Sequence, residues 1–423
     1  MSFLRVTAWN GVAVGIRMAT ALVLNKILAL FVGPGGYALI GQFQNAMAVA
    51  ITLGSGATAQ GVTRYTAEHF DDEAQQHRVW QTAGSITLIG CVVAALIVVP
   101  LSGWLARELL HDATLGPVFV ALALGLGALA MNALLLAIIN GRKATRLFVA
   151  ANIAGSLIGL VFTGGLAVWL GLRGALFALA LNQSIAFIAT AWLVRRERWF
   201  SWRYLVGPIN PAVLKALGRY ALMAATTALS TPIAQVTVRQ RLVADFGLAQ
   251  AGYFDAMMRI SSLYLLFFTS TMAIYYLPRI AEIRNDGKLR AEVAALVVRV
   301  APAVATISAT IYLLRFTVVR LLFDPRFLPM TSLFGYQMIG DVLKIVSWVY
   351  AYVMIGRGLT RAYIFTEVFF SITLVVAIAV ATRLFGIQGA SIGYMVNYAL
   401  YLPAVYVVFQ RAIGGRSPRE VAA

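Results

Sequence analysis

Long apolar runs separated by short polar connections fill the chain from one end to the other. Runs of about 20 predominantly apolar residues are long enough to cross a bilayer as helices. The pattern therefore predicts an all-α, polytopic membrane protein with about twelve transmembrane helices. The predicted spans cover residues 7–31, 37–63, 79–100, 115–140, 147–170, 175–194, 217–242, 252–278, 294–322, 331–355, 363–383 and 389–410.

The longest connection joins the sixth and seventh predicted spans. It reads RRERWFSWRYLVGPINP and interleaves arginines with aromatic residues, a composition suited to the headgroup layer of a membrane. Six spans precede it and six follow it, so the chain is expected to form two lobes. The predicted divisions are an N-terminal lobe at 1–194, a basic-aromatic interfacial linker at 195–215, a C-terminal lobe at 216–411 and a cytoplasmic tail at 412–423.

Composition and charge support the membrane assignment. Of the 423 residues, 61% are hydrophobic and 12% are charged, whereas soluble domains carry about 25% charged residues. The net charge of +18 is distributed unevenly over the connections: only Arg107, Arg173, Arg326 and Arg383 fall on one side of the membrane. Because basic connections stay in the cytoplasm, both termini are predicted to be cytoplasmic. The excess charge indicates contact with membrane lipids rather than with nucleic acid.

One predicted span carries a polar and aromatic stripe. Gln337, Asp341, Lys344 and Trp348 recur at steps of four, three and four, which places them on one face of a helix. A charge at the centre of a bilayer costs roughly 3 kcal/mol, so this face cannot meet lipid. It must face the protein interior or a water-filled cavity. A simple ion pair between Asp341 and Lys344 is an alternative to a cavity wall.

Basic residues exceed acidic ones within and at the ends of the spans. Only Asp255, Asp341 and Glu367 oppose them there, so the membrane interior is cationic and would attract an anionic substrate. Asp255 and Glu367 are candidate coupling groups or charge partners. The candidate substrate-binding residues are Arg17, Lys26, Arg64, Arg239, Arg241, Asp341 and Lys344.

Several of these charges also have a structural interpretation. Lys26 lies towards one end of its span, where a long side chain can extend to the interface. Arg64 and Glu68 are four residues apart and can form an interfacial ion pair. Asp255 and Arg259 have the same spacing and can neutralise each other. These alternatives remain open from the sequence alone.

Cysteine and histidine usage predicts no cofactor and no metal site. The single cysteine, Cys91, lies in the apolar run LIGCVVAALIVV, so an intrachain disulfide is impossible and a buried, unreactive thiol is expected. His69, His77 and His111 are too widely scattered over polar connections to indicate metal ligation.

Four segments of the chain resemble a known family. They are FVGPGGYALIGQFQN (31–45), GVTRYTAEH (61–69), YYLPRIAEI (275–283) and RLLFDPRFLPMTSLFGYQMIGDVLKIVSWVYAYVMIGRGLTRAYIFTEVFF (320–370). These segments resemble Wzx-type flippases of the multidrug/oligosaccharidyl-lipid/polysaccharide exporter superfamily, in particular the enterobacterial common antigen type. The resemblance extends over nearly the whole chain and is densest around 31–72 and 320–370.

The resemblance implies two six-helix lobes around a central cationic cavity. It further implies a flippase that moves an undecaprenyl-diphosphate-linked oligosaccharide, an O-antigen or enterobacterial common antigen type repeat unit, from the cytoplasmic to the periplasmic leaflet by alternating access. The implied location is the bacterial inner membrane, with polysaccharide polymerase and chain-length proteins as further partners. The implied cavity residues are Arg17, Lys26, Arg239, Asp341 and Lys344.

Two other functions are open alternatives. A cation-coupled multidrug exporter of the same superfamily would need an excess of acidic groups for its cationic substrates, whereas basic groups are in excess here. A membrane glycosyltransferase, polymerase or ligase would need catalytic groups on a substantial extramembrane loop. The longest connection is instead a basic-aromatic linker, so a transporter of an anionic lipid is the better supported interpretation.

Overall fold

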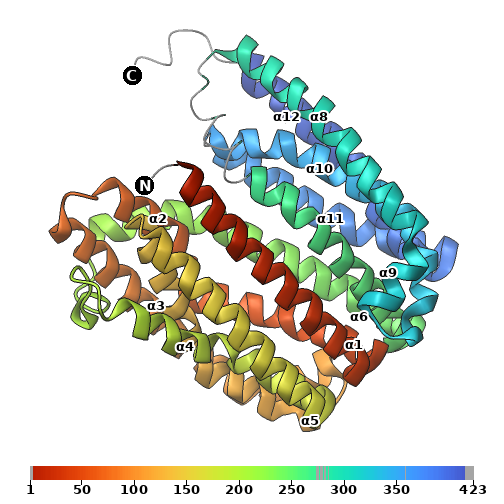
Figure 1. Cartoon of the computed structure of the whole chain (residues 1–423), viewed down its shortest axis with the longest axis horizontal. Coiled ribbons are helices and arrows are strands. Elements are labelled where there is room, and N and C mark those ends of the chain that lie inside the picture. Colours follow the sequence, from red (N-terminus) through yellow and green to blue (C-terminus); the bar gives the residue numbers. More distant parts are fainter. Residues whose placement is uncertain are drawn as a thin grey trace. The chain divides into compact units, whose positions relative to one another are not determined.

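The computed structural model describes residues 3–272, 276, 280, 283, 285–357 and 359–414, and in these residues it contains helices and no β-strand (Figure 1). Seven helical stretches in this described part are long and apolar enough to cross a membrane. The chain is therefore an all-α, multi-pass membrane protein, as its hydrophobic pattern predicts. It forms two compact units, unit 1 (Met1–Val236) and unit 2 (Thr237–Ala423).

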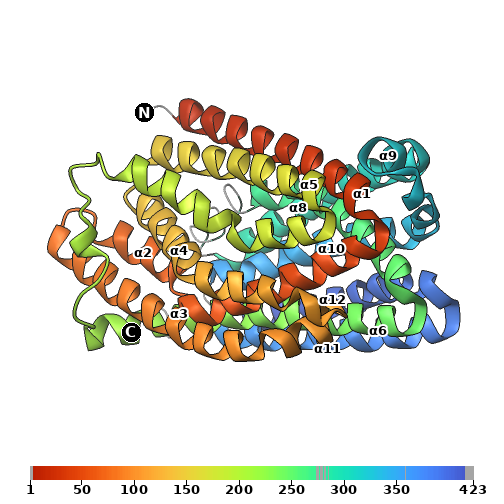
Figure 2. The same ribbon diagram turned by 90° about the horizontal axis from the view of Figure 1, so that it is seen from below.

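Unit 1 is built from long helices packed side by side. α5 packs against both α1 and α4, while α3 packs against α4 and α1 (Figure 2). α6 (Pro211–Thr271) begins in this unit and continues into unit 2. The other helices are α1 (Phe3–Ser55), α2 (Ala59–Glu68), α3 (Glu73–Leu110), the short η1 (Ala113–Leu115), α4 (Gly116–Gly141), α5 (Thr145–Val194) and the short η2 (Trp202–Tyr204).

Three helices are too long for a single crossing. α1, α5 and α6 have 53, 50 and 61 residues, and at 1.5 Å per residue each exceeds twice the roughly 30 Å of bilayer hydrocarbon. Each is interrupted at one glycine with a positive φ, namely Gly33, Gly171 and Gly247. Glycine adopts this conformation without the steric penalty of a Cβ atom. Each long helix therefore supplies two of the predicted spans.

The sequence Gly33-Pro34-Gly35-Gly36, whose composition is typical of a turn, forms only a one-residue interruption of α1. Only Gly33 leaves the helical region, with φ 72° and ψ 179°, and helix resumes at Pro34. A proline suits the first position of a helix because its φ is already fixed and its missing N–H has no partner there. In α6 the backbone stays helical at Pro232, although proline commonly kinks a helix, and the interruption lies at Gly247.

Two predicted spans are divided in the structure. The second does not run to Thr63, because α1 ends at Ser55 and the backbone then takes positive φ values at Gly56 and Ala57. The ninth is divided at Leu314, between α8 (Asp286–Leu313) and α9 (Arg315–Leu322). Apolar composition continues through both breaks, so hydropathy alone could not locate them.

The connection before α6 packs into unit 1 instead of lying wholly at the membrane surface. Phe200 and Leu205 are buried in a cluster with Trp80 of α3, and Trp202 remains 49% exposed. A Cβ atom at Gly84 would approach the Leu205 carbonyl oxygen to 1.7 Å, so α3 can pass this close only with glycine. The headgroup role predicted for the linker therefore remains a prediction for its exposed residues.

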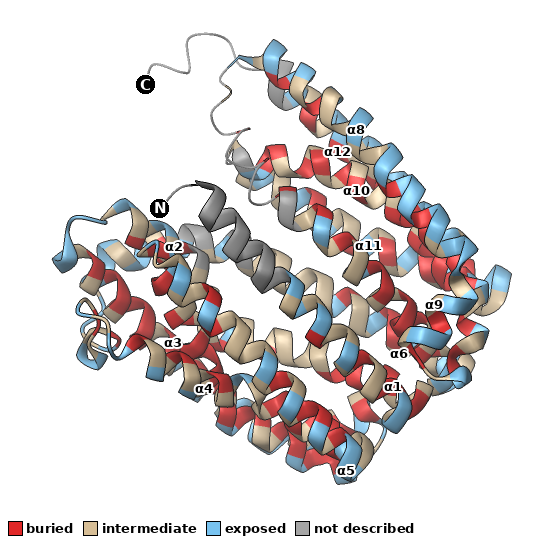
Figure 3. Cartoon of the chain, in the orientation of Figure 1, coloured by how far each residue is buried: buried red, intermediate tan, exposed pale blue. Residues whose placement is uncertain are grey.

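Unit 2 contains the rest of α6 and the helices that follow it. α12 packs against α10 and α11, and α8 packs against α10. Large apolar side chains remain exposed on the outer helix faces, as expected for contact with lipid (Figure 3). Besides α8 and α9, the helices are the short η4 (Pro325–Leu333), α10 (Phe334–Gly356), α11 (Thr360–Phe385), the short η5 (Gly386–Gln388) and α12 (Gly389–Gly414).

Some predictions about chain organisation stay untested. The boundary between the compact units falls inside α6, between Val236 and Thr237, while the sequence divides its lobes at 195–215. The end of the eighth predicted span and most of the predicted tail at 412–423 lie outside the described residues. The lobe division and the central cavity accordingly remain predictions.

Candidate functional site

A polar pocket of about 410 Å³ lies within unit 1, among α1, α4 and the two halves of α5. Its apolar walls come from side chains such as Leu24, Leu136 and Leu160. Its polar side chains are carboxamides, hydroxyls and one guanidinium, and no carboxylate is among them. They are Arg17, Thr20, Asn132, Asn152, Ser156, Asn182 and Gln183.

Arg17 supplies the positive charge of this pocket. It lies about 21 Å of helix rise from Phe3 and about 24 Å from Gly33, so it is far from both ends of its span. Its side chain is exposed to the pocket, and within the described part of the chain no residue forms a hydrogen bond or ion pair with its guanidinium. Its five N–H donors can therefore be directed to a ligand.

The carboxamides contribute hydrogen-bond acceptors around Arg17. Asn132 is 3% exposed, and its Nδ2–H donates to Gln183 Oε1 at 3.2 Å. The Oδ1 atoms of Asn132 and Asn182 are buried and receive no hydrogen bond from any described residue. A buried acceptor without a donor costs free energy, and a ligand hydroxyl or amide N–H would satisfy it. The pocket can thus bind an anion and neighbouring hydrogen-bond donors.

The sequence identifies Arg17 but not the carboxamides. Asn132 and Asn152 are single amides in separate apolar runs, and Asn182 lies in a third run beside Gln183 and Ser184, so no spacing along the sequence connects the three asparagines. They converge because α5 turns back at Gly171 and because both of its halves pack beside α4. The only sequence signal for these asparagines was the free-energy cost of placing a polar amide in a membrane span.

The other two basic candidates of unit 1 lie outside this pocket. Lys26 is half-buried on α1 and does not line the pocket. Arg64 lies on α2, where its Nε is 3.7 Å from a carboxylate oxygen of Glu68, and its side chain is 59% exposed. This contact matches the interfacial ion pair that the sequence allowed.

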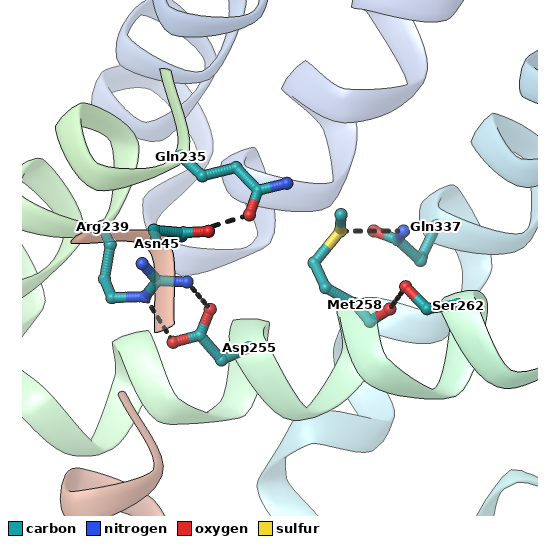
Figure 4. A network of polar contacts seen from close by, with 7 residues as sticks. All are labelled: Asn45, Gln235, Arg239, Asp255, Met258, Ser262 and Gln337. Atoms are coloured by element: carbon teal, nitrogen blue, oxygen red, sulfur yellow. Dashed lines mark hydrogen bonds and ion pairs between the residues drawn. The ribbon is translucent and has the colours of Figure 1, made fainter. Parts of the chain in front are cut away.

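Arg239 and Asp255 form a buried ion pair in unit 2 (Figure 4). The Nε and Nη2 groups of Arg239 donate to the two carboxylate oxygens of Asp255, each at 2.5 Å. Both side chains are 8% exposed. Arg239 precedes Gly247 in α6 and Asp255 follows it, so the break in the helix at Gly247 brings the two side chains together. The donors of Arg239 are therefore engaged within the protein.

Arg241 belongs to a more exposed pair on the same helix. Its Nε lies 2.7 Å from Asp245 Oδ2, with side chains 44% and 29% exposed. Figure 4 also shows the contact between Asn45 and Gln235 at 3.2 Å, which lies within unit 1. The Asn45 amide N–H thus donates to the Gln235 carbonyl oxygen within the fold.

Asp341 lies at the centre of a buried polar cluster in unit 2. It is fully buried and accepts hydrogen bonds from the hydroxyls of Tyr264 at 2.7 Å and Tyr394 at 2.8 Å. Gln337, one turn earlier, donates to Ser261 Oγ at 3.2 Å. The prediction that this stripe faces the protein interior is confirmed. The hydrogen bonds join α10 to α6 and α12.

Lys344 has an aromatic environment. Its ammonium nitrogen lies 5.2 Å from the ring centre of Trp348, 6.0 Å from that of Tyr394 and 5.9 Å from that of Tyr398. Cation–π attraction at such distances stabilises the charge. Within the described residues no ion pair joins Lys344 to Asp341. The two charges are still near enough to interact electrostatically, so the choice between an ion pair and a cavity wall stays open.

The two remaining candidates differ in their surroundings. Asp255 is engaged with Arg239, whereas Glu367 is half-buried on α11 and close enough to Tyr398 and Tyr401 to interact electrostatically. Cys91 is a buried free thiol, as predicted. In the described residues no group of three His, Cys, Asp or Glu side chains is placed to hold a metal ion.

Comparison with known proteins adds evidence on sequence and on fold. The profile of a family described as polysaccharide biosynthesis protein matches residues 27–332. Two curated proteins named lipid III flippase, from Escherichia coli (strain K12) and Shigella flexneri, are each 29% identical to the chain over 414 residues. These alignments cover 97% of this chain and 98% of each relative.

Solved structures share the fold at low identity. An inward-facing multidrug resistance transporter of the MATE family superposes with a TM-score of 0.77 at 17% identity, covering 96% of both chains. An outward-facing one gives 0.71 at 20% identity, covering 95% of this chain and 93% of that chain. A MOP superfamily transporter from Pyrococcus furiosus gives 0.71 at 18% identity, covering 97% and 95%. Such identities show a common fold and nothing about the substrate.

Proposed function

The chain belongs to the polysaccharide biosynthesis protein family, and from this we propose that it is a flippase that moves a polyprenyl-diphosphate-linked oligosaccharide across the membrane. The relatives named lipid III flippase span almost the whole chain and support this reading. The substrate we infer is an undecaprenyl diphosphate that carries a repeat unit of the O-antigen or enterobacterial common antigen type. The protein then acts as a transporter and not as an enzyme.

One observation in the structure carries the proposal. Arg17 presents to a pocket walled by carboxamides, at mid-helix depth, a guanidinium that has no counter-ion among the described residues. A guanidinium binds two phosphate oxygens through parallel N–H bonds, which suits a diphosphate. The unsatisfied acceptors of Asn132 and Asn182 suit sugar hydroxyls or acetamido N–H groups.

A polar pocket inside the membrane would lower the free-energy cost of moving this lipid's headgroup across the bilayer. A diphosphate and several sugars would each lose their hydration in crossing the bilayer, and an unpaired polar group in hydrocarbon costs several kcal/mol. A polar pocket inside the membrane replaces part of that hydration. Exposure of such a site to one side of the membrane and then to the other constitutes alternating access.

The other candidate residues receive narrower roles in the proposal. Lys26 is retained as a second cationic group for the headgroup. Arg239 holds the two segments of α6 together through Asp255, and its role is structural. Asp341 and Lys344 organise the core of unit 2, and Glu367 is kept as a coupling group. Arg64 and Arg241 are exposed ion-pair residues that can attract anionic lipid headgroups.

Charge supports the flippase over a multidrug exporter of the same superfamily. A cationic drug would require a carboxylate in its binding pocket, whereas the described pocket in unit 1 contains a guanidinium and no carboxylate. The MATE structures share the fold only, so they do not favour drug transport for this chain.

Transport by the purified protein tests this function. Proteoliposomes should move an undecaprenyl-diphosphate-linked oligosaccharide between leaflets faster than protein-free vesicles, as measured by access of an impermeant glycosidase. Imposed pH and potential gradients should reveal whether transport is coupled. Transport of a cationic drug, together with no transport of any polyprenyl-diphosphate sugar, would refute the proposal and favour an exporter.

We also propose that both termini lie in the cytoplasm and that the protein resides in the bacterial inner membrane. Polysaccharide polymerase and chain-length proteins would receive the flipped lipid on the periplasmic side. The excess of basic residues in one set of connections supports this orientation.

Cysteine labelling tests the orientation. With Cys91 replaced by alanine, Arg146→Cys and Arg196→Cys should resist a membrane-impermeant thiol reagent in spheroplasts, while Arg173→Cys and Arg326→Cys should react. All four side chains are exposed in the structure, so burial would not mask a reaction. Permeabilised cells provide the control, because all four cysteines should then react. The opposite labelling pattern would reverse the proposed orientation.

A further inference from the structure

An apolar groove of about 1070 Å³ lies on unit 1, along α1 and the first half of α5. Its lining is apolar along its whole length. On α5 it extends over thirteen residues, from Leu157 to Trp169, which is about 18 Å of helix rise. The side chains that define it are Val23, Ile27, Leu157, Val161, Val168 and Trp169.

Two adjacent glycines of α5 make the groove deep. A Cβ atom at Gly165 would meet no neighbouring atom within 4 Å, so the space beside it is open. A Cβ atom at Gly164 would lie 3.1 Å from Ile27 Cδ1, so the two helices approach closely beneath the groove. Val161 and Trp169 at its edges are 74% and 86% exposed. The groove is thus open along its length and closed at its floor.

The groove adjoins the pocket of Arg17. Leu160 lines both, and α1 and the first half of α5 contribute residues to both. Val23 and Ile27 follow Arg17 on α1 by six and ten residues, which places them about 9 and 15 Å further along the helix. The surface therefore changes from cationic and polar to apolar in one direction, over a distance that a single lipid can span.

We propose that this groove holds the first part of the polyprenyl chain while the diphosphate occupies the pocket of Arg17. This inference rests on the proposed function. A ligand whose anionic headgroup lies in that pocket must place its covalently attached chain nearby, and the groove is the adjoining apolar surface. An ordinary phospholipid fits less well, because its headgroup stays at the membrane surface while Arg17 lies near the middle of its span.

Filling the groove tests the proposal. Gly165→Leu should weaken binding of undecaprenyl diphosphate in nanodiscs by about tenfold or more, because the new side chain occupies the open space beside α5. Binding of dimethylallyl diphosphate, which has the same headgroup and one isoprene unit, should be unchanged. Gly127→Leu on α4 is the matched control, since a Cβ atom there also meets nothing within 4 Å and lines neither pocket.

A second measurement needs no variant. Undecaprenyl diphosphate with a photoreactive diazirine in its first isoprene units should label peptides from residues 157–169 of the wild-type protein. An excess of phosphatidylglycerol should not compete. Competition by that phospholipid would identify a general lipid groove and overturn the inference.

The outcomes separate the inference from the function on which it rests. If Arg17→Ala weakens binding of both diphosphates and Gly165→Leu weakens neither, the chain lies elsewhere, and only the groove assignment fails. If the wild-type protein binds neither diphosphate, the proposed function fails as well. Equal weakening by Gly165→Leu and Gly127→Leu would also refute the groove.

Discussion

Arg17→Ala is expected to abolish transport of the lipid-linked oligosaccharide while leaving the amount of protein in the membrane unchanged. The guanidinium forms no hydrogen bond or ion pair with another described residue, so its loss removes no polar interaction that the described fold depends on. Hydrogen bonds to charged groups contribute about 1.5–3 kcal/mol, which corresponds to roughly a ten- to hundredfold loss of affinity for the diphosphate. Arg17→Lys should retain part of the activity, because it keeps the charge and loses the planar fork.

Complementation of a flippase-deficient strain and flipping in proteoliposomes measure this effect. Arg64→Ala is the matched control, because it also removes one arginine from unit 1, and the ion pair that it breaks with Glu68 is exposed. Such pairs contribute about 0–1 kcal/mol, so the control should transport normally. Full complementation by Arg17→Ala at normal protein level would contradict the assignment of Arg17.

The helical architecture could be predicted because length and hydropathy decide it. A run of about 20 apolar residues has few alternatives to a membrane span. The interruptions within the long helices were harder to predict, because a local change of backbone conformation leaves the hydropathy of the sequence almost unchanged. Gly33 was recognisable beside Pro34, whereas Gly247 interrupts α6 without any such neighbour and is followed by ordinary helix-forming residues.

The candidate site could be predicted only in part, since it depends on tertiary contacts. The position of Arg17 in the middle of its span singled it out, and the structure adds the carboxamides that surround it. The polar stripe of α10 correctly indicated a face turned away from lipid. Its partners could not be inferred, because Tyr264 and Tyr394 come from other helices and tyrosine is common in membrane spans.

Arg239 shows most clearly why spacing along the sequence was insufficient. The sequence offered Arg259 as a neutralising partner for Asp255, because they are one helical turn apart. The structure places Arg239 against Asp255 across the break at Gly247, with two hydrogen bonds of 2.5 Å. A residue separation of sixteen carries no helical signal, so this pairing is visible only in the fold.

Removing either partner of this pair is expected to destabilise the protein strongly. Asp255→Leu leaves the Arg239 charge buried without its carboxylate, and Arg239→Met leaves the carboxylate without its guanidinium. Breaking a buried pair from one side costs about 3–5 kcal/mol, whereas replacing both partners by apolar residues is often neutral. Each single variant should therefore lower the thermal unfolding temperature in detergent and the yield, and the double variant should recover both.

Transport by the double variant shows whether Arg239 has only a structural role or also contacts the substrate. If the arginine only joins the segments of α6, then Arg239→Met/Asp255→Leu should transport nearly as well as the wild type, because the apolar pair restores the packing. Arg241→Ala is the control, since it breaks the more exposed pair with Asp245 and should cost less than about 1 kcal/mol. A double variant that is stable and inactive would show that Arg239 contacts the substrate, as the sequence alone suggested, and that its bond to Asp255 must open during transport.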